Sequence, residues 1–348
     1  MKALLLREYK NLELLDLPQP APAAGEILVQ VAACGICGSD VHGYDGSSGR
    51  RIPPIVMGHE AAGLVAATGP GVTRFKTGDR VTFDSTVYCG ECPYCLRGEM
   101  NLCDRRQVIG VSCGEYRRAG AFAEYVTVPE RICYALPDSM SFAEAAMLEP
   151  VSVALHAVKV SQIRGGETAL VIGAGMIGLL TLQAARAAGS SRVLIADVDL
   201  TRLRLAESLG ATETMLLSGD DLAREVVHRT GSGVDVALEA VGRNQTIQAA
   251  IHSVRKGGTV TLIGNIEPQI TIPLQVVVSR QLRLQGTAAS CGEYPEAIDL
   301  ISRGEIQVRP LITAVAPLED GARWFERLYA HEPNLMKIVL APHPELIA

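Results

Sequence analysis

The sequence has no excess of basic residues, no apolar run long enough to span a membrane and no recognisable export signal. Lysine and arginine number 32 against 38 acidic residues, which gives a net charge of −6 and a pI near 5.7. A nucleic-acid-binding surface would need a clustered basic face, so we exclude that class. The apolar start over residues 3–6 is too short for a secretory segment. We therefore expect a cytoplasmic protein that binds neither nucleic acid nor membrane.

Nine cysteines in a chain without an export signal are expected to be metal ligands and free thiols rather than disulfides. Four thiolates complete a tetrahedral zinc shell and leave no position open for chemistry. We therefore predict a structural zinc in a lobe at about residues 86–105. A redox-active C-x2-C disulfide and an iron–sulfur cluster are the alternatives for such spacing. The four candidate ligands, spaced C-x2-C-x2-C-x7-C, are Cys89, Cys92, Cys95 and Cys103.

A second group of ligand types is open. Cys37, His59 and Glu60 offer a thiolate, an imidazole and a carboxylate, and Glu149 is a further carboxylate that the fold could bring in. Zinc suits such a mixed shell, and its remaining position would admit a substrate oxygen. Zinc lowers the pKa of a hydroxyl that it binds, which favours loss of a hydride from the alcohol carbon. The alternative is that His59 is a buried, hydrogen-bonded histidine and Glu60 a surface acid.

The residues just beyond Cys37 predict a route for the released proton. Ser39 and His42 follow at two and five positions, and a hydroxyl can pass a proton through the cofactor ribose to an imidazole. Asp40 is a candidate for orienting His59 from behind. The alternative is that Ser39 and Asp40 only cap a turn and that His42 is a surface histidine.

The chain changes in character near residue 150. Before it, short alternating strands such as 27–32 and 123–128 are separated by glycine-containing turns, which indicates a small β-barrel. After it, apolar strands alternate with helices, as in a doubly wound α/β sheet. The expected helices are 151–162, 177–188, 201–209 and 246–253, and the expected strands are 169–172, 192–196, 234–238, 259–263 and a closing 335–340. We predict that a nucleotide-binding domain, 153–286, is inserted into a catalytic domain made of 1–152 and 287–348.

A glycine-rich turn follows the first of these buried strands and opens a helix. It reads G-x-G-x-x-G, and in that setting it predicts a dinucleotide site whose phosphates lie at the helix start. Asp197 ends the next strand, where an acid accepts hydrogen bonds from the adenosine ribose and disfavours a 2′-phosphate. NAD is therefore expected over NADP, although Arg202 lies close enough to soften this choice. The alternative is that the glycines serve packing alone. The predicted loop residues are Gly173, Gly175, Met176, Ile177 and Gly178.

Taken together, these motifs resemble the zinc-containing medium-chain alcohol dehydrogenases, and within them the sorbitol (polyol) dehydrogenase branch. The resemblance covers essentially the whole chain. The stretches that carry it are 34–42 (CGICGSDVH), 58–63 (GHEAAG), the four-cysteine lobe, 149–153 (EPVSV) and 173–178 (GAGMIG).

The resemblance implies a GroES-like β-barrel catalytic domain, an inserted Rossmann domain and a homo-oligomer, with a tetramer favoured over a dimer. It implies two zinc ions per subunit, with the catalytic one on Cys37, His59 and either Glu60 or Glu149. Ser39 and His42 match the positions of the family's proton relay. The implied reaction is hydride transfer between NAD and a secondary alcohol, such as a polyol.

One departure concerns the substrate. Sorbitol dehydrogenases carry an Arg-Tyr pair where this chain has Ala289 and Ser290, so the polar contacts expected here are Ser39, Tyr44 and Glu149. Other substrates of the branch are threonine, butanediol and sugar-alcohol phosphates. A phosphate would require a cationic pocket, for which the candidates are Arg50, Arg51 and Arg117. A non-catalytic zinc protein that senses NAD is the alternative from a different class.

Overall fold

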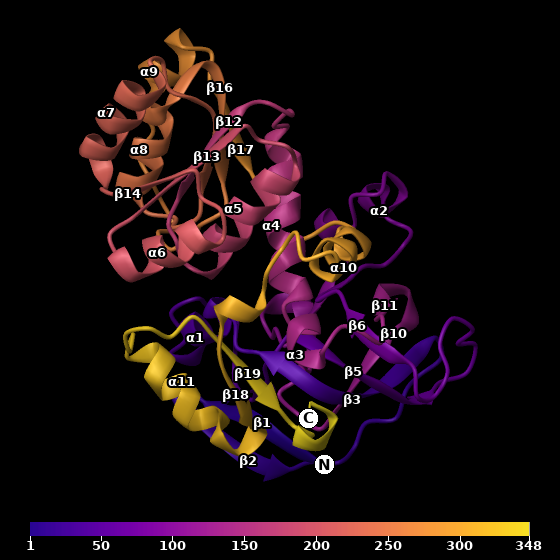
Figure 1. Cartoon of the computed structure of the whole chain (residues 1–348). Helices are drawn as coiled ribbons and strands as arrows, with labels where there is room; N and C mark the ends of the chain where they lie inside the picture. The colour runs from indigo at the N-terminus through magenta and orange to yellow at the C-terminus, as the bar shows by residue number, and fades with distance from the viewer. Residues whose placement is uncertain (348) are drawn as a thin grey trace. The chain divides into compact units, whose positions relative to one another are not determined.

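The computed structural model describes residues 1–347, with residue 115 described by its backbone alone. The chain forms two compact units. Figure 1 shows the chain coloured by residue number, from indigo at the N-terminus to yellow at the C-terminus. The first unit contains Met1–Glu149, Tyr294–Ser302 and Val308–Ala348, and the second contains Pro150–Glu293 and Arg303–Gln307. The domain boundaries predicted from the sequence, at 152/153 and 286/287, remain a prediction.

The first unit is built on a seven-stranded sheet whose central strand is β3. This strand, EILVQVAACG, is buried along most of its length. It pairs with β5 along its course, with β10 over its first half and with β19 at its last two residues. The sheet runs β11-β6-β5-β3-β19-β18, and β10 also pairs with β3. Its strands are β3 (Glu26–Gly35), β5 (Glu60–Thr68), β6 (Arg80–Phe83), β10 (Tyr125–Pro129), β11 (Cys133–Ala135), β18 (Ile312–Pro317) and β19 (Lys337–Ala341).

Smaller elements complete this unit. One three-stranded sheet runs β2-β1-β4, and another, β7-β8-β9, accompanies the cysteine lobe. The strands are β1 (Lys2–Glu8), β2 (Asn11–Asp16), β4 (Ile55–Val56), β7 (Thr86–Val87), β8 (Gln107–Ile109) and β9 (Arg117–Arg118). The helices are α1 (Gly38–Tyr44), α2 (Pro93–Leu96), α3 (Phe142–Ala145), α10 (Tyr294–Ser302) and α11 (Gly321–Tyr329).

The second unit is a six-stranded, all-parallel sheet in the order β14-β13-β12-β15-β16-β17, which confirms the predicted doubly wound α/β architecture. Near-continuous apolar runs such as TALVI in β12 suit strands covered on both faces. The strands are β12 (Thr168–Ile172), β13 (Arg192–Asp197), β14 (Glu213–Leu216), β15 (Val234–Glu239), β16 (Val254–Leu262) and β17 (Arg283–Gly286). The helices that accompany them are α5 (Met176–Ala187), α6 (Leu200–Ser208), α7 (Gly219–Thr230), α8 (Asn244–Ser253) and α9 (Leu274–Ser279).

Helix α4 (Leu148–Ser161) carries the chain from the first unit into the second. Its first two residues, Leu148 and Glu149, belong to the first unit, and the rest belongs to the second. Within residues 1–347, we find no helix with both the length and the apolar character needed to cross a membrane.

Candidate functional site

The register of two central strands brings Cys37, His59 and Glu60 together. Gly35, the last residue of β3, pairs with Glu60, the first residue of β5. Cys37 follows two residues later as the cap of helix α1, and His59 immediately precedes β5. One ligand atom from each of these three side chains lies within 4.8 Å of the others. Two strand ends and a helix start therefore create the predicted open group.

Asp40 stands behind His59 in a fully buried position. Its Oδ2 lies 3.5 Å from His59 Nδ1 and accepts a hydrogen bond of 3.4 Å from the Cys37 amide. Burial disfavours the charged imidazole, yet the Asp40 carboxylate and the Cys37 thiolate raise the pKa of His59 well above its usual range. This surplus of negative charge around a mixed thiolate–imidazole–carboxylate set fits a divalent cation, and zinc in particular.

Arg51 compensates the charge of Asp40. Its guanidinium donates to Asp40 Oδ1 from Nε at 3.1 Å and from Nη2 at 2.8 Å, and Nη2 also donates to Ser39 Oγ at 3.0 Å. Only 3% of the Arg51 side chain is exposed. Burial opposes ionisation of Asp40, but His59 and Arg51 together hold the pKa of its carboxyl below the ordinary value. Asp40 therefore stays ionised between them.

Glu60 has a buried cation of its own. Lys337, at the start of β19, donates to Glu60 Oε2 at 2.6 Å and to the Ile36 carbonyl at 3.0 Å, and both charged side chains are buried. Burial opposes the ammonium charge, but Glu60 and Cys37 raise the pKa of Lys337, which therefore stays protonated. Gly35 leaves space for this pair, because a Cβ there would lie 2.2 Å from Glu60 Oε2. One carboxylate oxygen of Glu60 is thus held by lysine.

Glu149 lies close to this group but outside it. It is buried, accepts a 3.3 Å hydrogen bond from Ser85 Oγ, and is absent from the set of ligand atoms that converge with Cys37. Burial raises the pKa of Glu149 to about 7, and repulsion from Glu60 contributes. In this arrangement Glu60, rather than Glu149, is the carboxylate that joins Cys37 and His59.

The two relay candidates lie on one face of α1. Ser39 and His42 are three residues apart in the helix and both are exposed, whereas Asp40 on the opposite side is buried. Tyr44, the third predicted substrate contact, is bonded within the first unit. Its hydroxyl donates to the Lys10 carbonyl at 2.8 Å and its ring packs among aromatic side chains of α11, so a substrate contact stays a prediction.

Two of the three arginines suggested for a phosphate are also engaged elsewhere. Arg51 is buried against Asp40, and Arg117 donates to the Pro54 carbonyl at 2.8 Å. Arg50 is exposed. The structure therefore offers no converging set of these arginines for a phosphorylated substrate.

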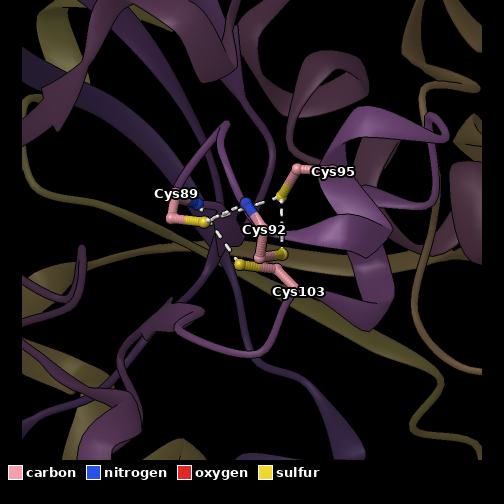
Figure 2. Close-up of side chains that lie close together, drawn as sticks. All are labelled: Cys89, Cys92, Cys95 and Cys103. Atoms are coloured by element: carbon pink, nitrogen blue, oxygen red, sulfur yellow. Dashed lines mark hydrogen bonds between the residues drawn. The ribbon is translucent and has the colours of Figure 1, made fainter.

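The four lobe cysteines converge as their spacing predicts, with their sulfurs facing one another (Figure 2). The Cys92 and Cys95 sulfurs are 3.5 Å apart, and those of Cys89 and Cys95 are 3.9 Å apart. Zinc–sulfur bonds of about 2.3 Å in a tetrahedron set sulfur–sulfur edges of about 3.8 Å. All nine cysteines of the chain are free thiols, so the four are not consumed by disulfides. The geometry fits a closed zinc centre.

Backbone amides prepare the lobe sulfurs for a metal. The amide of Cys92 donates to Cys89 Sγ at 3.3 Å, and the amide of Arg105 donates to Cys103 Sγ at 3.4 Å. The amide of Glu91 is the largest influence that lowers the pKa of Cys89, to about 6. Amides that favour the thiolate favour the form that binds zinc.

The glycine loop of the second unit is closely packed at one glycine and open at another. Gly178 is required by packing, because a Cβ there would lie 1.7 Å from the Gly173 carbonyl oxygen. Gly175 caps α5, and a Cβ there would meet nothing within 4 Å. The chain itself therefore does not need a glycine at 175, and the open space at this helix start suits a phosphate group. Met176 and Ile177 form the first turn of α5.

The acid at the end of β13 is tied to the same loop. Asp197 accepts a 2.6 Å hydrogen bond from the Ala174 amide and a 2.9 Å bond from the Asp199 amide. Arg202 lies 3.7 Å from Asp199 in an exposed ion pair. The Asp197 carboxylate therefore stands where the adenosine ribose is expected, and the predicted cation Arg202 is paired with Asp199, which caps helix α6.

Sequence reasoning missed two charged residues of the open group. It assigned Arg51 to a phosphate, and it did not single out Lys337. The usable signal for Lys337 was a lone lysine at the head of the apolar stretch 338–341, because a charge in a buried strand requires a partner.

Comparisons with known proteins agree with these features. Residues 23–138 match the family described as "Alcohol dehydrogenase GroES-like domain", and residues 177–303 match "Zinc-binding dehydrogenase". The sorbitol dehydrogenase of Bacillus subtilis is 33% identical over 99% of this chain and 98% of its own length. The D-xylulose reductase A of Aspergillus niger is 37% identical over 88% of this chain and 87% of its own. A zinc-binding dehydrogenase of Sinorhizobium meliloti, solved with NADP, matches with a TM-score of 0.88 and 32% identity, covering 98% of this chain and 99% of that one.

Proposed function

The chain belongs to the zinc-dependent medium-chain alcohol dehydrogenase family, and we propose that it transfers a hydride between NAD and a secondary hydroxyl of a polyol. Its class is an alcohol or polyol dehydrogenase that uses zinc and a nicotinamide cofactor. The observation that carries the proposal is the convergence of Cys37, His59 and Glu60 beside the exposed hydroxyl of Ser39.

The residues that would perform the reaction have separate tasks. Cys37, His59 and Glu60 would hold the catalytic zinc, and Asp40 would fix the imidazole of His59. When bound, zinc acidifies the substrate hydroxyl and NAD accepts the hydride. Ser39 would take the proton from the substrate hydroxyl, and His42, on the same face of α1, would release it to solvent.

A polyol is supported by the named activities of two relatives, the sorbitol dehydrogenase and the D-xylulose reductase. Ala289 and Ser290 leave sorbitol itself less favoured than the class. A sugar-alcohol phosphate has less support because Arg51 and Arg117 are bonded to other groups. Ser39 and Glu149 remain the proposed polar contacts to the substrate.

The preference for NAD rests on Asp197, whose carboxylate would repel a 2′-phosphate. Arg202 faces Asp199, so its charge is already partly balanced. The related structure with NADP makes a side-by-side comparison of the two cofactors necessary.

We further propose a cytoplasmic homotetramer. Cysteines used as metal ligands and free thiols suit a reducing compartment. Leu274 and Val278 of α9 are exposed by 68% and 69%, and α9 leads into β17, the last strand of the parallel sheet. Light scattering should give a tetramer for the native chain and a smaller species for a Leu274→Asp, Val278→Asp variant.

The test of function is nicotinamide reduction by the purified protein on polyols, diols, threonine and sugar-alcohol phosphates. It is run with NAD and NADP, before and after chelation. Turnover with a polyol and NAD that disappears on chelation and returns with zinc supports the proposal. Tight NAD binding and full zinc content without turnover on any compound would favour the alternative of an NAD-sensing protein.

A further inference from the structure

We propose that Arg51 is a positioning residue that fixes His59 through Asp40 and fixes the Ser39 hydroxyl directly. This inference rests on the proposed function, because it assigns Ser39 and His59 their tasks. It gives one buried cation control over both the metal ligand and the first hydroxyl of the proton route.

The guanidinium is placed where it can reach both partners at once. Nη2 carries two hydrogens, and its two bonds, to Asp40 Oδ1 at 2.8 Å and to Ser39 Oγ at 3.0 Å, use both of them. Nε adds a second bond to the same Asp40 oxygen at 3.1 Å. The planar fork of arginine permits this bridging, whereas the single ammonium of lysine does not reproduce it.

The arm through Asp40 acts on the metal ligand. Because Arg51 occupies Oδ1, the other oxygen, Oδ2, is left to face His59 Nδ1 at 3.5 Å and the Cys37 amide at 3.4 Å. A carboxylate that orients a ligand imidazole typically changes metal affinity or activity by about 10–100-fold when it is disturbed. Arg51 thus acts on His59 without touching it.

The arm through Ser39 acts on the proton route. Arginine can only donate, so Ser39 Oγ must accept in this bond and its own hydrogen must point elsewhere. The hydroxyl is thereby left with one free acceptor position and a hydrogen directed away from the guanidinium. That is the state in which it can take a proton on one side and release one on the other.

Gly43 leaves space for the Arg51 side chain. Gly43 lies against the Arg51 stem, since a Cβ at 43 would lie 2.1 Å from Arg51 Cγ. An arginine that served stability alone would need one carboxylate partner, yet this one also donates a hydrogen bond to the hydroxyl of Ser39, an exposed residue of α1.

The experiment compares Arg51→Met, Arg51→Lys and the control Arg50→Met, which removes the same charge from the neighbouring exposed position. Each full-length, zinc-loaded variant is assayed for kcat and KM with the most active alcohol of the panel. Metal affinity of the open site is measured separately by cobalt titration, with Cys37→Ser identifying the absorption that belongs to this site. Ser39→Ala and its double variant with Arg51→Met complete the set.

For Arg51→Met we expect kcat and open-site metal affinity each to fall by about 10–100-fold, while Arg50→Met matches the native protein. Arg51→Lys should restore metal affinity, because a cation again faces Asp40, but not kcat, because the bridge to Ser39 is lost. In the Ser39→Ala background, Arg51→Met should lower kcat little further.

Three results would overturn the inference. They are native kcat and metal affinity in Arg51→Met, recovery of both by Arg51→Lys, or an undiminished effect on kcat in the Ser39→Ala background. If Arg51→Met does not fold, Arg51→Lys against Ser39→Ala still decides the question. If the native protein turns over no alcohol, the proposed function fails while the cobalt titration still tests Arg51.

Discussion

The two cysteine-containing centres of the first unit are built on opposite plans. The closed centre takes four thiolates from one stretch of chain, with the two outermost cysteines 14 residues apart, and local backbone amides support it. The open centre takes three different ligand types from the residues at the starts of α1 and β5, and buried charges from other segments surround it. Arg51 and Lys337 both belong to this second plan.

The difference teaches what each centre must accomplish. A closed shell of four sulfurs needs only to hold a metal and a lobe, which short loops and amides achieve. An open shell must keep ionised carboxylates out of water and fixed in direction, which requires matched cations in the core. We therefore expect the two centres to respond differently to the same kind of change.

The largest effect is expected from His59→Ala. Loss of this ligand should lower kcat/KM by about 10⁴-fold, equivalent to about 5.5 kcal/mol, because the zinc contribution to the reaction is lost. The thermal midpoint should change little in comparison, because the lobe metal is untouched. Steady-state assays and thermal melts on the same preparation test this. The prediction would be contradicted if the variant unfolded readily while each folded molecule kept native activity.

Cys92→Ser should have the opposite profile. Loss of a structural metal is expected to cost about 4 kcal/mol, which lowers the midpoint by roughly 10 °C, while turnover per folded molecule is retained. Limited proteolysis should show new cleavage at about residues 86–105. A variant that stays folded and assembled but loses turnover would contradict the structural assignment of this centre.

Lys337→Met tests whether buried charge stabilises the open centre. Removing the cation leaves Glu60 buried without its partner, and we expect a loss of about 3 kcal/mol in the free energy of unfolding. The matched control is Lys2→Met, which breaks the exposed pair with Glu319. Denaturant unfolding of both variants is the measurement, and equal stabilities would show that burial of the pair has no consequence. The double variant with Glu60→Gln should recover part of the loss.

The smallest effect is expected from Arg105→Met. Arg105 pairs with Glu91 beside the closed centre, but both side chains are exposed and water can replace the interaction. Metal retention against a chelator and the melting profile of the lobe should match those of the native chain. A clear loss of lobe zinc would mean that the closed centre also depends on nearby charge, which would weaken the contrast.

The fold was predictable where the pattern was regular. Apolar runs such as TALVI and the glycine loop that follows β12 identified the parallel sheet. Strand β14 was not predicted because it is a short, partly exposed edge strand, and tertiary packing rather than local preference accounts for it. Helix α7 was also not predicted, although its ends carry local helix signals: two acids in the first turn and a left-handed Gly231 after the last.

The candidate site was predictable to the extent that its chemistry is local in sequence. The spacing of Cys89 to Cys103 predicted their convergence, and Asp40 was placed behind His59 from its position near Cys37. The contact between Lys337 and Glu60 spans 277 residues, and no local pattern encodes it. The bond from the Tyr44 hydroxyl to the Lys10 carbonyl was not predictable either, because a tyrosine near a catalytic segment carries no mark of which way its hydroxyl points.

Gly35 and Gly43 give the open centre an unusual mutational profile. Neither adopts a left-handed backbone, yet a methyl group at either would collide with Glu60 or Arg51. In a saturation scan, alanine at these positions should therefore register as loss of activity, although neither position carries a functional group. Any redesign of substrate preference that keeps every charged residue would still have to leave these two empty volumes alone.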